Sequence, residues 1–413
     1  MKKALLILVG GRIIPNVLTI LNEEPDLIVP IISKDERNFE RFEKGIRTLF
    51  AEKNRSFDWE NCWDTSFKVE AFNLEDIKEK CLQAIDKYPG CEWIFNITSA
   101  TTIMSMGAYE AAKERLAQGI PISCWYLDTA HTNIVRLTGK ERDSSIFNIS
   151  LDDYVAVHNR RLEKSVWQKP RADIEKQWLT FACFLVEDPK HLQVHKNLID
   201  NIKKEIVERK KTAREKNLSL DIDTTSFTFK INTTIYDLLE KAYAVGLLED
   251  LSKDTENYTF KFSKEQFAFF EGTWLELYVW SEVSKLEAFK DCRWSQYIVD
   301  SDISVNTETA RYTDRQNELD VSAIYKAQLF IFECKTGYDA FKSDTIYKLD
   351  SVASTFGGGF VSKFLITSRS QKDIQDEKFE GKVRIRGIKL ITQEQLQNIG
   401  QIVEDKAKAS EGK

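Results

Sequence analysis

Short apolar runs alternate with amphipathic stretches over the first third of the chain. Between the apolar runs, helical spacing of apolar residues predicts helices over Glu36–Lys53, Leu74–Tyr88 and Thr101–Gln118. The alternation predicts a doubly wound, largely parallel α/β sheet for residues 1–150. Ligands bind such sheets beyond the carboxyl ends of the strands, so loops 10–16 and 98–102 are the candidate binding loops. The five predicted strands are Ala4–Val9, Leu27–Ile32, Ser66–Ala71, Trp93–Thr98 and Ile122–Leu127.

The middle of the chain, residues 151–262, has a different pattern that indicates a small winged-helix-like linker module. The charged run 208–216 contains acidic residues, so a solvated helix end is favoured over a nucleic-acid site. His191 and His195 lie one helical turn apart without a third ligand, so ordinary helix-surface histidines are favoured over a metal site. The predicted elements are helices over Asp173–Glu187, His191–Lys216 and Asn232–Val245, then an alternating strand within Leu247–Phe262.

Residues 263–413 form a second predicted α/β domain. It opens with the capping-box sequence Ser263–Gln266 and an apolar helix that extends to about Lys285. Two of the strands that follow flank a short turn and predict an antiparallel hairpin. The predicted strands are about Trp294–Val305, Glu318–Tyr325, Leu329–Cys334 and Phe360–Thr367, with a helix at Thr345–Thr355.

Composition limits the class of function. The chain has 413 residues, of which 42% are hydrophobic and 30% charged, so it supplies packed cores for two or three domains. The formal net charge is −6, which argues against a basic coat for nucleic acid but permits a nuclease that binds metal through carboxylates. Seven cysteines without a C-x-x-C pair indicate reduced thiols in a cytoplasmic protein. No stretch approaches the roughly 20 apolar residues of a spanning helix, so no membrane partner is expected.

The most informative polar residues lie on the predicted hairpin. Asp320 and Glu333 fall on adjacent strands, where a tight turn can bring their side chains together, and Lys335 projects from the same face as Glu333. Close carboxylates on an otherwise apolar strand suit a divalent cation, and oxygen ligands favour Mg²⁺ or Mn²⁺. A further carboxylate is expected from the preceding helix, Glu276 in preference to Glu271. The alternative is a surface ion pair between Glu333 and Lys335, with Asp320 capping a turn.

The order of these residues resembles the PD-(D/E)xK nuclease superfamily, in which a helical Glu precedes an Asp, a Glu-x-Lys and a helix with a further polar group. Here the order is Glu276, Asp320, Glu333-x-Lys335 and Lys348. The resemblance implies that all five are catalytic residues in phosphodiester hydrolysis. Glu276, Asp320 and Glu333 would hold Mg²⁺ or Mn²⁺, Lys335 would assist the attacking water or the phosphate, and Lys348 would support them.

The candidate loops of the first domain resemble those of CARF domains, which bind cyclic oligoadenylates made by type III CRISPR complexes. Segment 10–16 is similar to the family's first loop, and segment 96–104 to its signature N-x-T-G-G-T-K-x-M, with Ser99-Ala100 and Thr102 in place of Gly-Gly and Lys. By chemistry alone, hydroxyl residues that open a helix suit a phosphate, but they also make a plain helix cap. The resemblance implies ligand contacts from Gly10, Gly11, Arg12, Ile14, Asn16, Thr98, Ser99, Ala100, Thr101, Thr102 and Met104.

The order of sensor, linker and nuclease is similar to that of CRISPR-associated CARF–PD-(D/E)xK effectors, and it implies a homodimer that shares one ligand. The leading hypothesis is a metal-dependent nuclease that cyclic oligoadenylate, above all cyclic tetra-adenylate, activates in antiviral defence. One alternative is an unregulated repair or restriction-type nuclease. Another is a ligand-binding regulator whose winged-helix part binds DNA and whose nuclease fold is inert. The sequence leaves open whether the substrate is DNA or RNA and whether the sensor degrades its activator.

Overall fold

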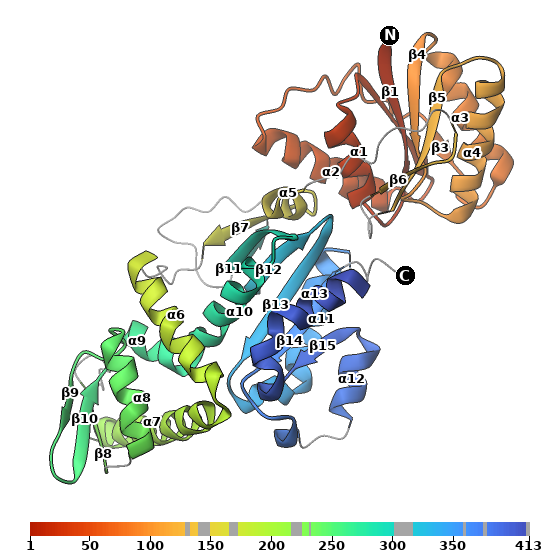
Figure 1. Ribbon diagram of the computed structural model, residues 1–413. Helices are drawn as coiled ribbons and strands as arrows, with labels where there is room; N and C mark the ends of the chain where they lie inside the picture. The colour runs from red at the N-terminus through yellow and green to blue at the C-terminus, as the bar shows by residue number, and fades with distance from the viewer. Residues whose placement is uncertain are drawn as a thin grey trace.

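The computed structural model describes residues 1–128, 133–138, 149–164, 172–215, 225–230, 233–300, 317–357, 361–374 and 378–409. The amino-terminal domain contains the doubly wound sheet that the sequence predicts, with strand order β3-β2-β1-β4-β5-β6 (Figure 1). The first five strands run parallel, and β6 pairs antiparallel with β5 at the edge. The strands are β1 (Lys2–Val9), β2 (Leu27–Ser33), β3 (Lys68–Val69), β4 (Cys91–Asn96), β5 (Ile122–Asp128) and β6 (Asn133–Arg136).

Helices cover both faces of this sheet, because its central strands are apolar on both sides. The helices are α1 (Ile14–Glu23), α2 (Arg37–Glu52), α3 (Leu74–Lys87) and α4 (Thr102–Ala117). The first two pack on one face and the last two on the other. The sequence predicts α2, α3 and α4 but not α1, whose start it treats as part of the loop 10–16. Pro15 lies in the first turn of α1, where its missing N–H costs no hydrogen bond, so the helix begins inside the expected loop.

Two short elements join this domain to the carboxy-terminal sheet: α5 (Leu151–Ala156) and β7 (Arg160–Lys164). β7 pairs antiparallel with β11 and forms the edge of that sheet. Residues 160–164 therefore belong structurally to the carboxy-terminal sheet, although the sequence analysis places them in the linker module. Their polar sequence, Arg-Arg-Leu-Glu-Lys, gives no strand signal.

In its described residues, the linker module contains three helices and a small antiparallel sheet of order β8-β10-β9. The helices and β10 lie where the sequence predicts them, whereas β8 and β9 are additional. This is the winged-helix-like arrangement expected from helices followed by a hairpin. Its elements are α6 (Ala172–Glu187), α7 (Pro189–Glu215), α8 (Thr233–Ala244), β8 (Ser226–Lys230), β9 (Leu251–Lys253) and β10 (Asn257–Lys261).

The carboxy-terminal domain is a mixed sheet of order β15-β14-β13-β12-β11-β7, flanked by helices. The capping box at Ser263 and the β12–β13 hairpin confirm the sequence predictions, while β15, α12 and α13 are additional. A π-helical turn, Phe269–Thr273, interrupts the predicted long helix. The other elements are α9 (Lys264–Ala268), α10 (Trp274–Ser284), β11 (Phe289–Asp300), β12 (Asn317–Tyr325), β13 (Gln328–Lys335), α11 (Ser343–Thr355), β14 (Ser362–Thr367), α12 (Phe379–Ile385), β15 (Ile388–Ile391) and α13 (Ile399–Ala409). The predicted strand at about 294–305 ends in residues 301–305, which lie outside the described residues.

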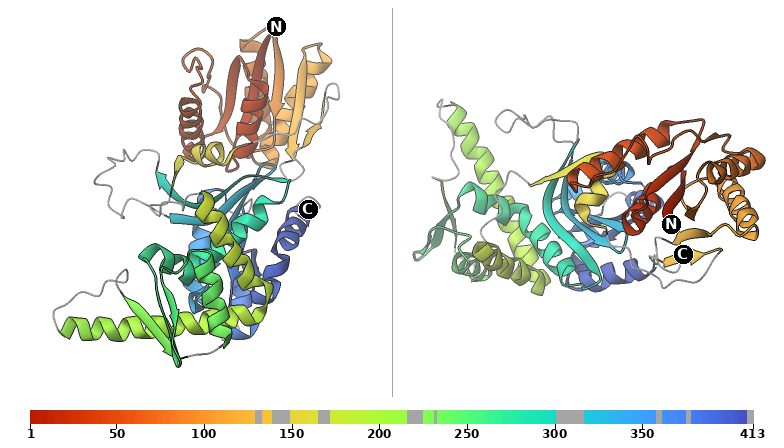
Figure 2. Two further views of the ribbon diagram at one scale, coloured as in Figure 1. Left: turned by 60° about the vertical axis from the view of Figure 1, so that its left-hand side comes forward. Right: turned by 90° about the horizontal axis from the view of Figure 1, so that it is seen from above.

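One hydrophobic core continues from the amino-terminal domain into the carboxy-terminal sheet, so the two are packed together rather than tethered. Figure 2 shows α5 between them and the linker module at the far end of the molecule. The Tyr154 hydroxyl donates to the Phe356 carbonyl at 3.2 Å, and the Arg293 guanidinium binds both carboxylate oxygens of Asp152 at 2.8 and 2.6 Å. A rearrangement at this interface can therefore reach both domains. No helix within the described ranges is long and apolar enough to cross a membrane.

Two histidines lie in this packing as buried neutral groups. His158 stacks on Tyr154 in the interface between the domains. His195 is buried, with its Nε2 2.7 Å from the Phe270 carbonyl, so the expectation of a helix-surface residue is wrong at this position. Burial lowers the pKa of each ring to about 4. Both rings are buried against aromatic side chains of other elements, Phe356 for His158 and Phe270 for His195. A helical sequence pattern alone does not show such neighbours.

We expect acid to destabilise the protein through these two rings. Their folded-state pKa lies below the unfolded value, so the unfolded chain binds more protons between pH 6.5 and 4, and the stability that the neutral rings contribute is lost as the pH falls. Each ring should reduce the free energy of unfolding by about 2 kcal/mol between pH 7.5 and 5. Urea denaturation of His158→Phe at both pH values should show a correspondingly smaller fall; an equal fall would contradict the assignment.

Candidate functional site

The hairpin brings the predicted acids and lysine together. Val321 pairs with Phe332 across the antiparallel hairpin. One residue further from the turn, Asp320 on β12 and Glu333 on β13 therefore lie on adjacent strands. The Lys335 ammonium lies 2.7 Å from Glu333 Oε1 and 3.3 Å from Asp320 Oδ2. Asp320 and Glu333 are only 5% and 3% exposed, so a surface ion pair does not describe this cluster. Asp320 also accepts a 2.7 Å hydrogen bond from the Cys334 backbone N–H, which fixes its carboxylate against the hairpin.

Lys348, on α11, also joins the cluster. Its ammonium lies 3.1 Å from Glu333 Oε1, so Glu333 receives one lysine from its own strand and one from the helix that follows. Burial and the charge of Glu333 raise the pKa of Asp320 to about 7. Burial opposes the charged form of Lys335, but the two carboxylates outweigh it and raise the pKa of Lys335 above its usual range. The site therefore holds a permanent ammonium beside two carboxylates that repel each other.

Glu276 faces the same cluster from α10. Its Oε2 accepts a 3.0 Å hydrogen bond from Trp294 Nε1, and no lysine or arginine of the described ranges forms an ion pair with it. Burial and the neighbouring Asp320 and Glu318 raise the pKa of Glu276 well above its usual range. Glu271 instead lies on the π turn and pairs with Lys203 at 2.7 Å. The structure therefore supports Glu276 over Glu271 as the helical acid.

A cavity of about 420 Å³ opens in front of these groups. Glu276, Glu318 and Lys335 line it, whereas the buried Asp320 and Glu333 are not among its lining residues. Glu318 is an acid that the sequence analysis did not select, although it stands two residues before Asp320 and a strand therefore projects it to the same face. Its carboxylate accepts a 2.9 Å hydrogen bond from the Ser295 hydroxyl.

The oxygen-only chemistry of the acidic side chains suits a hard divalent cation. Glu276 lines the cavity and is repelled by the carboxylates of Asp320 and Glu318, and carboxylate oxygens suit Mg²⁺ or Mn²⁺ better than Zn²⁺. Among the described residues, no three acidic, histidine or cysteine side chains are grouped closely enough to form a ready-made metal site. Asp320 and Glu333 instead share Lys335, which supplies positive charge to the cluster.

The amino-terminal domain has its own cavity, of about 620 Å³, at the carboxyl ends of its parallel strands. Most of the predicted ligand-binding residues line it: Gly10, Gly11, Arg12, Thr98, Ser99, Ala100, Thr101, Thr102 and Met104. Sequence analysis did not select Ser33, Asn38, Ala71, Ser105 or Tyr126, which also line it. Ser33 and Tyr126 lie at or near strand ends, and this is the signal that could have found them.

Two family models match the chain. Residues 4–154 match the Card1 CARF domain, and residues 263–410 match the Card1-like endonuclease domain. The chain is a CARF-domain protein with a Card1-like endonuclease domain. No curated protein matches it.

Two solved structures share the fold of the whole chain. Protein VC1899 from Vibrio cholerae is 17% identical, with a TM-score of 0.72, over 99% of this chain and 98% of that chain. Can2 from Sulfobacillus thermosulfidooxidans, solved in complex with cyclic tetra-adenylate, is 18% identical, with a TM-score of 0.66, over 96% of each chain. The likeness of fold therefore extends through all three parts of the chain.

Two of the predicted contact residues of the CARF domain point elsewhere. Ile14 lines a different cavity, between the domains, and Asn16 is buried. The Asn16 amide donates to the Leu8 carbonyl at 2.9 Å and its oxygen accepts from the Asn96 amide at 3.1 Å. Sequence spacing placed both in a loop, but α1 begins at Ile14, and the first turn directs them inward.

The signature loop of the CARF domain is held by a buried polar network. Asn96 accepts from the Thr98 hydroxyl at 2.7 Å, and the Thr98 oxygen accepts from the Leu127 backbone N–H at 2.7 Å. Thr101 caps α4 by accepting from the Met104 backbone N–H at 3.2 Å. Ser99 differs from them, because among the described residues its buried hydroxyl has no hydrogen-bond partner. Ser99 is therefore the hydroxyl of this loop that a ligand can satisfy.

Proposed function

We propose that the chain is a metal-dependent nuclease that cyclic oligoadenylate activates in type III CRISPR defence, with cyclic tetra-adenylate as the foremost candidate. The observation that carries the proposal is the convergence of Asp320, Glu333 and Lys335 in one cluster of the endonuclease domain. Such a set suits hydrolysis of a phosphodiester bond in DNA or RNA. Neither backbone is favoured by the side chains that line the cavity.

The catalytic roles follow from position and charge. Glu276, Asp320 and Glu333 would hold Mg²⁺ or Mn²⁺, which when bound polarises the scissile phosphate and lowers the pKa of water. Lys335 carries its charge at all physiological pH values, so it can bind a phosphate oxygen or orient the attacking water. Lys348 holds Glu333 in place from α11.

The cavity of the CARF domain supports the choice of activator. It combines the first turn of α4, the buried hydroxyl of Ser99 and Arg12, and these groups suit phosphate oxygens. Arg12 brings positive charge to a cavity in which Thr102 replaces the lysine of the family signature. The fold shared with Can2, which binds cyclic tetra-adenylate, agrees with this choice.

The first loop of the CARF domain links this cavity to the endonuclease domain. Gly11 and Arg12 line the ligand cavity, and residues 11–15 also line a small cavity of about 70 Å³ with Gln328 and Phe356. Gln328 begins β13, which carries Glu333, and Phe356 follows α11, which carries Lys348. A ligand that displaces this loop would therefore press on both elements that hold the catalytic cluster. The ligand would activate the enzyme by binding the arrangement with the displaced loop more tightly than the arrangement with the loop in place.

An apolar face beside the ligand cavity supports a homodimer. Tyr126, Val135, Leu137 and Met106 are 41%, 45%, 40% and 48% exposed, and Tyr126 pairs with Val135 across β5 and β6. Tyr126 also lines the ligand cavity. Exposed apolar residues that cluster in this way mark interaction surfaces. A dimer formed through this face would place two CARF cavities beside each other.

The test is cleavage of fluorescent single- and double-stranded DNA and RNA, with Mg²⁺ or Mn²⁺, and with and without a panel of cyclic oligoadenylates. We expect cyclic tetra-adenylate to raise the rate by roughly 5- to 150-fold, the range that coupling free energies of 1–3 kcal/mol produce. EDTA should abolish cleavage. Equal rates with and without every ring would favour an unregulated nuclease, and no cleavage under any condition would contradict the proposal.

A further inference from the structure

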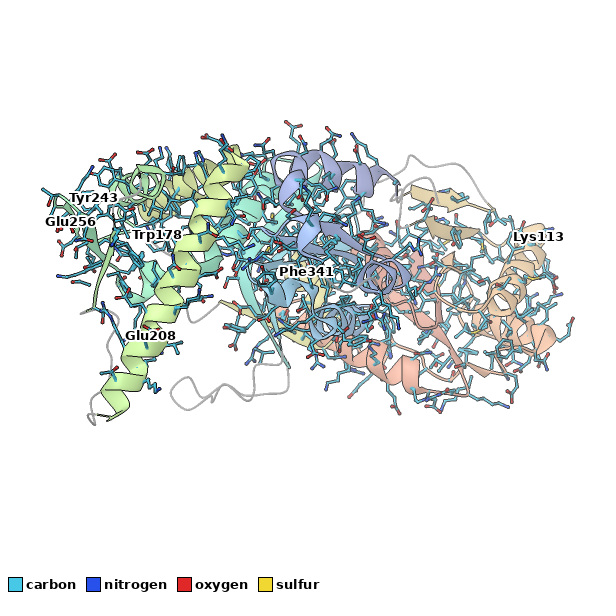
Figure 3. All side chains as sticks on the ribbon, turned by 90° about the horizontal axis from the view of Figure 1, so that it is seen from below. Lys113, Trp178, Glu208, Tyr243, Glu256 and Phe341 are labelled. Carbon is cyan, nitrogen blue, oxygen red and sulfur yellow. The ribbon has the colours of Figure 1, made fainter. Side chains whose placement is uncertain are left out.

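The linker module forms one wall of the endonuclease cavity. Trp178 from α6 and Lys203 from α7 line it together with Glu276 and Lys335. Trp178 packs on Phe269 of the π turn, with ring centroids 4.7 Å apart. Figure 3 shows Trp178 beside α7, whose outer end near Glu208 projects from the molecule. Two elements that sequence analysis assigned to a spacer thus reach the proposed active site.

Acidic side chains outnumber basic ones in the cavity lining, so a polyanionic substrate would need the lysine of this wall to bind there. Its described lining carries Glu265, Glu271, Glu276, Glu318 and Asp339, against the two cations Lys203 and Lys335. Lys335 is already bound by two buried carboxylates. Lys203 is 47% exposed and, among the described residues, forms one ion pair, with Glu271. An exposed pair of this kind is readily exchanged for another anion. Lys203 is therefore the lysine of the lining best placed to bind an incoming phosphate.

Trp178 supplies an unused donor at the same wall. Its side chain is 5% exposed, and across the described chain its Nε1–H has no hydrogen-bond partner. A buried N–H without a partner carries an uncompensated desolvation cost, which an acceptor on a ligand would remove. The ring cannot move away freely, because it packs against Phe269.

The π turn lies against this wall and is itself held in place. The Thr336 hydroxyl donates to the Glu271 carbonyl at 3.1 Å and so ties the turn to the residue that follows Lys335. π turns within α-helices are frequent at functional sites, because they redirect backbone groups without ending the helix. Glu271, the partner of Lys203, is thus held at a fixed place in the cavity lining.

A second lysine of α7 lies on the same side of the helix. Lys196 precedes Lys203 by seven residues, which is two helical turns. Its ammonium lies 5.2 Å from the ring centre of Tyr338, a 52% exposed residue between Gly337 and Asp339 of the cavity lining. Basic side chains beside an exposed aromatic ring are the usual elements of a single-strand binding surface. The wall thus continues past the mouth of the cavity.

We propose that Lys203 and Trp178 are positioning residues that bind the sugar-phosphate backbone of the nucleic-acid substrate. Lys203 exchanges Glu271 for a substrate phosphate, and Trp178 Nε1–H donates to a neighbouring backbone oxygen. This inference rests on the proposed nuclease function and adds the linker module to the substrate site. It differs from the expectation that the charged end of α7, residues 208–216, is a solvated surface, because it concerns the inner part of the helix.

The test compares Lys203→Ala, Trp178→Phe and the control Lys190→Ala. Lys190 is an exposed lysine of the same helix that does not line the cavity. Binding of a 20-nucleotide fluorescent DNA or RNA is measured in the Glu333→Gln background, so that no cleavage intervenes. We expect Lys203→Ala to weaken binding about tenfold and to reduce the slope of log K against log salt by about 0.7 for single strands. Trp178→Phe should raise Kd severalfold with an unchanged slope, and Lys190→Ala should change neither.

The slope of log K against log salt separates a phosphate contact from a structural effect. Loss of one phosphate contact lowers the slope by the contribution of one counterion, whereas a distorted linker module would not be expected to change it by that amount. Kinetics in the otherwise wild-type protein should show a raised KM for Lys203→Ala with kcat less affected. If wild type cleaves nucleic acid while Lys203→Ala keeps both Kd and slope, the inference is wrong and the nuclease proposal stands. If the parent protein neither binds nor cleaves any nucleic acid, both are wrong.

Discussion

Replacement of Glu333 by Gln should lower nucleic-acid cleavage by roughly 10³-fold in the presence of activator and Mn²⁺. Glu333 is the residue that two lysines share, and its carboxylate faces Asp320 across the hairpin. The amide keeps the shape but removes the charge that holds Lys335 and Lys348 and that would bind the cation. The rate is measured with a fluorescent substrate at saturating activator.

The fold should survive this change. Removal of one of two repelling carboxylates relieves Asp320, and Lys348 is 41% exposed, so water can solvate its ammonium. The control is Glu287→Gln, which makes the same chemical change at an exposed residue away from the cavity and should leave the rate unaltered. Near-wild-type cleavage by a Glu333→Gln protein whose melting temperature is unchanged would remove the catalytic assignment.

The clustering of Asp320, Glu333, Lys335 and Lys348 could be predicted because its geometry is local. Asp320 and Glu333 belong to one hairpin with the two-residue turn Lys326-Ala327, and strand alternation places Lys335 beside Glu333. Lys348 follows on the next helix. Such short-range rules need no knowledge of the rest of the chain, and they would also have selected Glu318, which alternates with Asp320 on β12.

What could not be predicted depends on contacts between distant segments. The Trp178 and Lys203 wall requires the linker helices to lie against the π turn, which no local pattern shows. Asn16 likewise looked like a loop residue until α1 turned it toward Leu8 and Asn96. β7 pairs with β11, which lies more than 120 residues further along the chain. In each case tertiary packing, rather than local propensity, decides the role of the residue.

Replacement of Gly10 by Ala should abolish regulation while it leaves the catalytic cluster chemically intact. A Cβ at Gly10 would overlap the Ser99 carbonyl oxygen and lie 2.9 Å from Ala100 Cα, both backbone atoms of the signature loop. The first loop and the signature loop must therefore separate, which should cost about 1–3 kcal/mol of stability. Since both loops line the ligand cavity, affinity for cyclic tetra-adenylate should fall by about tenfold or more.

The neighbouring residue provides the matched control. A Cβ at Gly11 meets no atom of the described structure within 4 Å, so Gly11→Ala should keep the melting temperature of the wild type. Isothermal titration with cyclic tetra-adenylate and urea denaturation of both variants separate affinity from stability. Because the same loop lines the small cavity between the domains together with Gln328 and Phe356, Gly10→Ala should also lose activation at ligand concentrations that restore binding. A Gly10→Ala protein that binds and responds like the wild type would show that the approach of these two loops does not set the activator site.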